Sequence, residues 1–199
     1  MTLERIYERI YRGIDRRVRR SKLRLRNARP GIWQVKRRLK GPIVGCEVGV
    51  FKGIHALQML QTLPNLIRLY LVDPYTRYTG YKDFQSPGNQ LLQGAEEEAH
   101  IRLQPYRDRI IWVRDKFDAK HIPEPLDFIY IDGQHTYEAV THDIRHATHL
   151  VKPGGIIAGH DYYPAEHRLN AKFGVGKAVR EHYGKNHHFY ISDWWVIKE

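Results

Sequence analysis

Apolar residues along the chain follow two alternating patterns. Short runs that are apolar throughout have the length of β-strands buried on both faces. Between them, apolar residues recur every three or four positions, as in a helix with one buried side. These patterns predict strands at residues 43–48, 69–72, 110–113, 128–131 and 155–158, and helices at 54–62, 90–103, 137–150 and 176–183. Such alternation indicates a parallel sheet covered by helices on both faces.

The end of the chain departs from this alternation. Two apolar runs, 189–191 and 194–197, are separated only by Ser192 and Asp193, which suits an antiparallel pair. We therefore predict an α/β fold of the Rossmann-like, doubly wound kind. Its seven-stranded sheet is mostly parallel, with an antiparallel C-terminal edge strand.

The first forty residues have a different character. Residues 2–26 predict a helix with one apolar stripe on a basic surface, and residues 32–40 a second short basic helix. Gly41 and Pro42 separate these from the first strand. We expect a basic helical arm at residues 1–40 and an α/β domain at residues 41–199.

The positive charge of the chain is concentrated in this arm. Of the formal net charge of +11, eight charges lie in residues 1–30, which hold eleven Arg or Lys and three acidic residues. Such a concentration points to a partner. Because the stripe contains Ile and Tyr, we expect docking on the domain or homo-oligomerisation, with nucleic acid and an anionic membrane surface as alternatives.

Composition bears on the cellular compartment in which the protein is expected. Cys46 is the single cysteine, so no intrachain disulfide can form. No apolar run approaches the ~20 residues that span a bilayer, and the N-terminus lacks the apolar core of a signal peptide. A cytoplasmic protein is expected.

Candidate chemistry lies at the carboxyl ends of the predicted strands, where open α/β sheets bind their ligands. The first strand runs into an acidic residue and a glycine turn, Glu47-x-Gly49-x-x-x-Gly53, and the second ends in Asp73. Glycines let the backbone approach a ligand closely, and an acid about 20 residues farther on can bind ribose hydroxyls. A tight β–α connection and a helix cap are the alternative explanations.

Two later segments carry a family resemblance. Residues 126–138 (LDFIYIDGQHTYE) and 150–162 (LVKPGGIIAGHDY) resemble class I S-adenosylmethionine-dependent methyltransferases, in particular the macrocin-type and catechol-type O-methyltransferases. The resemblance covers about residues 43–198 and leaves out the arm. It implies that residues 41–199 form an S-adenosylmethionine-dependent methyltransferase domain.

The resemblance also implies cofactor contacts. Glu47, Gly49 and Gly53 would surround the methionine part and ribose, and Asp73 would bind the ribose. Asp115 would lie near the adenine, although the family more often has Asp-Ser where this chain has Asp115-Lys116. Asp132 is predicted to lie against the cofactor as well.

A metal site is predicted beside the cofactor. Asp132 and Asp161 follow neighbouring strands, and converging carboxylates suit Mg²⁺ or Mn²⁺. Relatives hold their ion with residues that match Asp132, His160 and Asp161, but with an acid at position 160. His160 favours a softer ion or no tight site, and both carboxylates could instead bind only cofactor, substrate or backbone.

His135, three residues beyond Asp132, is the predicted general base, and Asp132 is counted with it as catalytic. In the catechol type, a lysine at this spacing deprotonates the acceptor hydroxyl. Histidine does the same near neutral pH, since its ordinary pKa is about 6.5. Capping of the helix that starts near Thr136 is the alternative role.

The long loop after Asp73 carries Tyr75, Tyr78, Tyr81 and Phe84, which suit either stacking on an acceptor or packing on the domain. We predict methyl transfer to a hydroxyl of a small molecule, such as a sugar or glycosylated metabolite. The alternatives are an RNA methyltransferase that uses the arm, and a non-methylating relative with the same fold, as in the cephalosporin-hydroxylase-like group.

Overall fold

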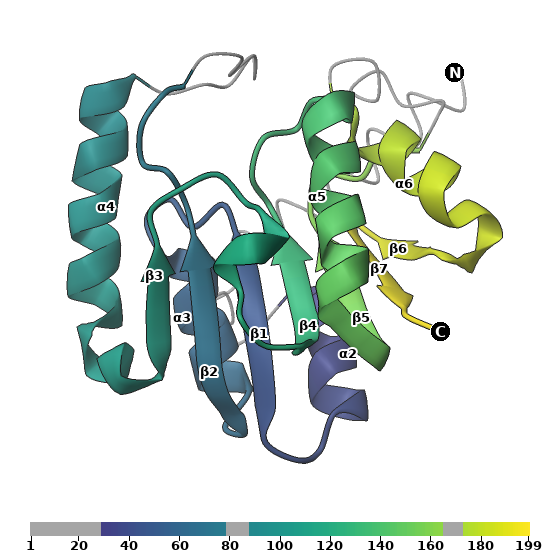
Figure 1. The fold of residues 1–199 in the computed structure, drawn as a ribbon, viewed down its shortest axis with the longest axis horizontal. Coiled ribbons are helices and arrows are strands. Elements are labelled where there is room, and N and C mark those ends of the chain that lie inside the picture. The colour runs from purple at the N-terminus through teal and green to yellow at the C-terminus, as the bar shows by residue number, and fades with distance from the viewer. Residues whose placement is uncertain (1–28, 79–87, 165–172) are drawn as a thin grey trace, which may run out of the picture.

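A computed structural model describes residues 29–78, 88–164 and 173–199. The predicted helix at residues 2–26 lies outside these ranges. Seven strands form one sheet in the order β3-β2-β1-β4-β5-β7-β6 (Figure 1). They are β1 Ile43–Val48, β2 Leu66–Val72, β3 Ile110–Val113, β4 Leu126–Ile131, β5 Val151–Gly159, β6 His188–Tyr190 and β7 Asp193–Ile197.

Strands β1 to β5 are parallel, and β7 is antiparallel to both β5 and β6. The predicted fold class is confirmed, with β6 at the edge and antiparallel β7 beside it. The direction in which the strands are added reverses between β1 and β4, which is where such sheets bind ligands.

Within the described residues, five helices and three short 3₁₀ helices accompany the strands. They are α2 Pro30–Arg38, α3 Ile54–Thr62, α4 Asn89–Leu103, α5 Tyr137–Leu150, α6 Val175–Tyr183, η2 Gln104–Arg109, η3 Ala119–His121 and η5 Gly184–Asn186. Among the described helices, none is long and apolar enough to cross a membrane.

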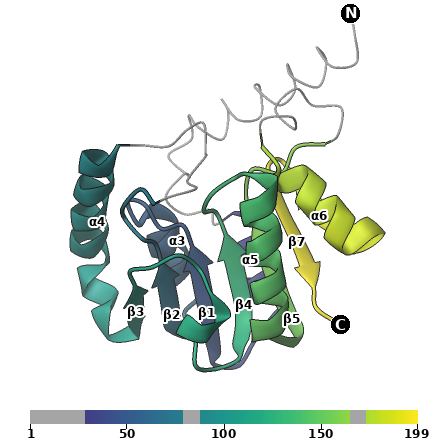
Figure 2. The ribbon, with the colours of Figure 1, turned by 45° about the horizontal axis from the view of Figure 1, so that its top comes forward.

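The sheet divides the core into two layers because successive strand residues point to opposite faces. On β2, Leu69 and Leu71 pack with α2, α3 and α4, whereas Tyr70 and Val72 pack with α5 and α6. Figures 1 and 2 show α3 behind the sheet and α5 in front of it. Each face is therefore covered, as the apolar strands require.

Strand β5 begins earlier than its apolar run predicts. Lys152, Pro153 and Gly154 interrupt the pattern, but the strand continues back to Val151, which pairs with Leu126. Gly154 has a φ of 78°, and the register shifts at this point. An irregularity that glycine permits therefore lets polar residues enter the strand.

Helix α2 packs against β5 and β7. Ile32 and Val35 are fully buried, and Gly31 lets the helix approach closely, because a Cβ there would lie 2.8 Å from the Cβ of Ala158. The predicted division between residues 40 and 41 stays a prediction. The described part of the arm contributes to the core of the α/β fold.

Candidate functional site

A cavity of about 1000 Å³ lies at the carboxyl ends of four parallel strands. Gly49, Asp73, Asp115 and Asp132, which follow β1, β2, β3 and β4, all line it. Helices α4 and α5, the 3₁₀ helix η3 and the loops that follow the strands contribute the rest of its wall. The structure thus brings four of the predicted cofactor residues to one space.

Gly49 is needed where the loops after β1 and β4 meet. Its φ is 86°, and a Cβ at this position would collide with the backbone carbonyl of Asp132. Gly53 also has a positive φ, but a Cβ there would lie 3.2 Å from the Cβ of Ala99 on α4. Gly49 therefore shapes the cavity, whereas Gly53 fits the turn against a helix.

The carboxylate of Asp73 fastens the glycine turn. Its Oδ2 accepts hydrogen bonds of 2.9 Å from the backbone N–H groups of Val50 and Phe51, and its Oδ1 accepts one of 2.8 Å from Tyr75. Burial raises the pKa of Asp73, and the three backbone donors counter this effect. The predicted ribose ligand thus also holds the loop on which a cofactor would rest.

Glu47 lies below the cavity and is not among the residues that line it. Its Oε1 is 2.8 Å from Nδ1 of His55 on α3, and both side chains are buried. Burial raises the pKa of Glu47 and lowers the pKa of His55. The predicted contact of Glu47 with the cofactor stays a prediction, and His55 is its observed partner.

The loop aromatics have separate roles. Tyr75 is buried, and its hydroxyl donates a 3.0 Å hydrogen bond to the carbonyl of Phe51. Tyr78 lines the cavity, with its hydroxyl 3.4 Å from Oε1 of Gln134 and the Nζ of Lys116 4.9 Å from its ring. Tyr81 and Phe84 lie outside the described residues. Packing thus accounts for Tyr75, whereas Tyr78 forms part of the cavity wall.

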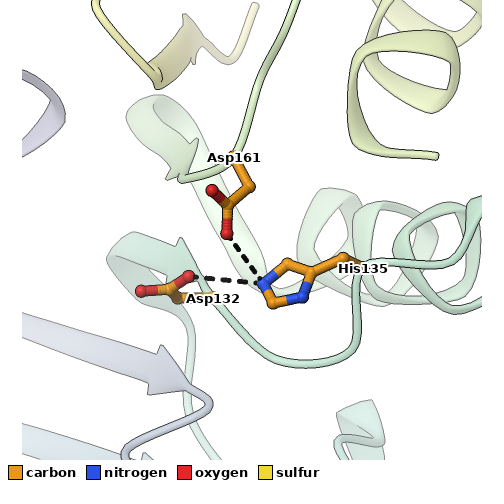
Figure 3. Close-up of side chains that lie close together, drawn as sticks. All are labelled: Asp132, His135 and Asp161. Carbon is orange, nitrogen blue, oxygen red and sulfur yellow. Dashed lines mark ion pairs between the residues drawn. The ribbon is translucent and has the colours of Figure 1, made fainter. Parts of the chain in front are cut away.

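A cluster of charged side chains lies at the ends of β4 and β5 (Figure 3). Nε2 of His135 is 3.0 Å from Oδ2 of Asp161 and 3.8 Å from Oδ1 of Asp132. Asp161 has a φ of 54°, so its backbone adopts a conformation that is uncommon outside glycine. The predicted convergence of the two carboxylates is observed, and His135 lies beside them.

His160 completes this carboxylate–histidine cluster, which we define as Asp132, His135, His160 and Asp161. Its Nδ1 is 3.3 Å from Oδ1 of Asp161 and 3.8 Å from Oδ1 of Asp132. Its Nε2 is 2.8 Å from the hydroxyl of Ser192. Asp161 therefore contacts one histidine through each of its oxygens.

Arg29 is a member of the site that the sequence patterns do not reveal. Its Nη1 lies 2.6 Å from Oδ2 of Asp132 and 3.1 Å from the hydroxyl of Tyr130. Burial alone would raise the pKa of Asp132, but the charge of Arg29 and the contacts with His135 and His160 hold it well below its usual range. Because 103 positions separate Arg29 from Asp132, no local signal marks the pair.

The role of His135 as a helix cap is taken by its neighbour. Thr136 is the N-cap of α5, and its hydroxyl accepts a 3.3 Å hydrogen bond from the N–H of Ala139. In Figure 3, the second ring nitrogen of His135, Nδ1, lies on the side of the ring away from both carboxylates. His135 also lines the cavity, so its side chain lies where a ligand would bind.

Three members of the cluster, Asp132, His135 and Asp161, form a donor set that fits a divalent cation. Ligand atoms of Asp132, His135 and Asp161 all lie within 4.8 Å of one another. Burial would raise the pKa of Asp161, but its contacts with His135 and His160 lower it well below its usual range, so both carboxylates are anionic. Mixed oxygen and imidazole ligands suit Mn²⁺ better than Mg²⁺.

Comparison with protein families gives one match. The model of a family described as "Methyltransferase domain" matches residues 46–162, which is more than half of the chain. The match runs from the second half of β1 through β5 and includes every cavity residue described above. A search among curated proteins finds none that matches the chain.

Solved structures of similar fold include methyltransferases of two kinds. A candidate rRNA methylase from Clostridium thermocellum is 16% identical, with a TM-score of 0.60 over 84% of this chain and 95% of that chain. The O-methyltransferase TomG from Streptomyces achromogenes, solved with S-adenosylmethionine, is 12% identical, with a TM-score of 0.54 over 85% and 78%. A candidate caffeoyl-CoA O-methyltransferase from Staphylococcus aureus is 12% identical, with a TM-score of 0.55 over 87% and 85%. At these identities the likeness shows the fold alone.

Proposed function

The chain belongs to the methyltransferase-domain family, whose cofactor is S-adenosylmethionine, and from this premise we propose that it methylates a hydroxyl group of a small molecule. A sugar or glycosylated metabolite is the proposed acceptor class. Tyr78 supports this proposal, because an aromatic ring at the cavity wall can stack on the apolar face of a sugar.

The pairing of His135 with Asp161 carries the proposal. In the neutral imidazole, a proton on Nε2 would face Oδ2 of Asp161, 3.0 Å away, and Nδ1 would carry the lone pair. An acceptor hydroxyl next to Nδ1 would pass its proton there as its oxygen attacks the methyl carbon. The new O–CH₃ bond forms while the S–CH₃ bond breaks, and S-adenosylhomocysteine leaves.

The rest of the site would position the reactants. The sulfonium methyl is already activated, so holding the acceptor in line accounts for much of the rate. Asp73 and the turn at Gly49 would hold the cofactor, and Asp115 would lie near its adenine. Asp132, at the end of β4, would lie between the cofactor and the acceptor.

A divalent cation, when bound, would stabilise negative charge on the acceptor oxygen. Asp132, His160 and Asp161 are the proposed ligands. Ser192 supports this assignment, because its hydroxyl contacts Nε2 of His160 and so leaves Nδ1 on the side of the carboxylates.

The basic surface of α2 favours RNA as a second candidate substrate. Lys36, Arg37, Arg38 and Lys40 are all exposed, and most of the net charge lies in residues 1–30. If RNA is the substrate, its affinity should fall steeply with salt because each phosphate contact releases counterions. A salt-independent affinity would remove this candidate.

Calorimetric titration with S-adenosylmethionine and S-adenosylhomocysteine, with and without Mg²⁺ and Mn²⁺, tests the proposal first. We expect micromolar binding that Asp73→Ala weakens by about a hundredfold, because the variant loses a charged acceptor of several hydrogen bonds. Transfer of a ¹³C-labelled methyl group to candidate acceptors, followed by NMR, then shows whether oxygen is methylated. Absence of cofactor binding under every condition would overturn the proposal.

A further inference from the structure

The guanidinium of Arg29 is held in place by a buried network at the start of α2. Tyr130 accepts a 3.1 Å hydrogen bond from Arg29 and donates one of 2.9 Å to Oδ1 of Asp193. Oδ2 of Asp193 accepts the N–H of Gly31 at 3.1 Å. Because Tyr130 and Asp193 are almost fully buried, this network fixes the helix terminus and with it Arg29.

The backbone around Arg29 is equally well defined. Arg29 is the N-cap residue of α2, and its carbonyl accepts hydrogen bonds of 2.9 Å from Ile32 and 3.2 Å from Trp33. Pro30 follows in the first turn, and Ile32 anchors the helix in the core. The position of Arg29 beside Asp132 is therefore a consequence of how α2 packs.

The contact between Arg29 and Asp132 bears on any cation at the cluster. Nη1 of Arg29 lies 2.6 Å from Oδ2 of Asp132, whereas Oδ1 is the oxygen that faces both His135 and His160. Two positive charges a few ångströms apart repel each other, and the repulsion is strong where water is largely excluded. Asp132 retains only about a fifth of its side-chain exposure, so screening there is weak.

We propose that Arg29 is a built-in counter-cation of Asp132, with which a divalent cation has to compete for the carboxylate–histidine cluster. The guanidinium neutralises Asp132 when no ion is bound and lowers the affinity of the cluster for one. Arg29 is thus a positioning residue that sets how strongly the site holds a cation. This inference rests on the proposed cation site, but it does not depend on which acceptor is methylated.

Direct titration with Mn²⁺, followed by electron paramagnetic resonance of the free ion, tests the competition. We expect Arg29→Gln to bind Mn²⁺ at least about tenfold more tightly than the wild type, because the repelling charge is gone. Arg29→Lys keeps that charge and should stay within about threefold of the wild type. The double variant Arg29→Gln, Asp132→Asn should lose the gain.

Arg37→Gln is the matched control. It removes one positive charge from an exposed position of the same helix, about 12 Å along the helix axis from Arg29. At physiological ionic strength, charges this far apart are largely screened, so its Mn²⁺ affinity should equal that of the wild type. Thermal melting of each variant confirms that the fold is intact.

Two results would overturn the inference. One is an affinity of Arg29→Gln that equals or falls below that of the wild type, which would mean that Arg29 supports cation binding or does not affect it. The other is an absence of Mn²⁺ binding in every variant, which would remove the cation site itself. Calorimetry with S-adenosylmethionine on the same samples reports separately on the methyltransferase function, so the two failures remain distinguishable.

Discussion

On the β1 and β2 side, the cavity wall is held by backbone hydrogen bonds, whereas on the β4 and β5 side the carboxylate–histidine cluster is held by contacts between side chains. On the first side, backbone N–H groups bind Asp73, and Gly49 lets one loop touch the next. On the second side, Asp132 and Asp161 contact Arg29, His135 and His160 through side-chain atoms alone. The proposed function assigns the cofactor to the first arrangement and the acceptor to the second.

Removing His135 should have the largest effect on activity, and it tests the carboxylate–histidine cluster. We expect His135→Ala to lower kcat by about 10²–10⁴, the usual contribution of a general base, with little change in cofactor affinity. Steady-state kinetics and calorimetry measure the two quantities separately. His149→Ala, on the exposed side of α5, is the control and should leave kcat unchanged. An unchanged kcat in His135→Ala would remove His135 as the base.

A substitution at Gly49 tests the side of the cavity that is held by backbone. Gly49→Val places a β-branched residue at a φ of 86° and against the carbonyl of Asp132, so we expect a loss of about 3 kcal/mol or more in the free energy of unfolding. Urea denaturation measures this loss. Gly94→Ala is the control, because nothing lies within 4 Å of a Cβ there and alanine stabilises a helix by about 0.8–1 kcal/mol. Equal stability of Gly49→Val and the wild type would show that the two loops can separate.

The smallest expected effect is a change in the pH dependence of stability when Glu47, a buried side chain of β1, is replaced. Because burial raises the pKa of Glu47 above its ordinary value of 4.5, the folded protein keeps a proton that the unfolded chain releases. The contribution of this group to stability is therefore full below that pH and falls as the pH rises through the range between the two values. The Glu47→Gln variant has no ionisable group at this position, so its stability should not decrease in this way as the pH rises.

Urea midpoints of both proteins between about pH 5 and about pH 7 check this expectation. The stability of the wild type should drop relative to the variant by at most about 1.4 kcal/mol per pH unit. A constant difference would mean that Glu47 is ionised in the folded protein. Cofactor titration of the same variant also decides whether Glu47 contributes to binding.

Most of the fold could be predicted because apolar runs and turn residues are local signals. Helix α5 begins and ends where its spacing predicts, and β1 does the same. Strand β5 shows the limit, since the start of a strand that runs through Lys152-Pro153-Gly154 depends on pairing with β4. Pairing is a property of the folded sheet and leaves no mark in the apolar pattern.

The site could be predicted only as far as strand ends reveal it. Asp132 follows an apolar run directly and Asp161 follows another after Gly159 and His160, so the geometry of a parallel sheet brings them together. Arg29, His55 and Ser192 carry no such mark. Each meets its partner because of how a helix or loop packs, and Arg29 in addition is one of many arginines in a basic segment.

The hydrogen bond from Gly31 to Asp193 has a consequence for folding during synthesis. It joins positions 162 residues apart, so α2 leaves the ribosome long before the strand that it packs against has been made. Until β7 is complete, Tyr130 lacks its acceptor and Arg29 lacks the fixed helix that carries it to Asp132. A nascent chain that stops short of Asp193 therefore lacks the buried carboxylate that binds both Gly31 and Tyr130 beside Arg29.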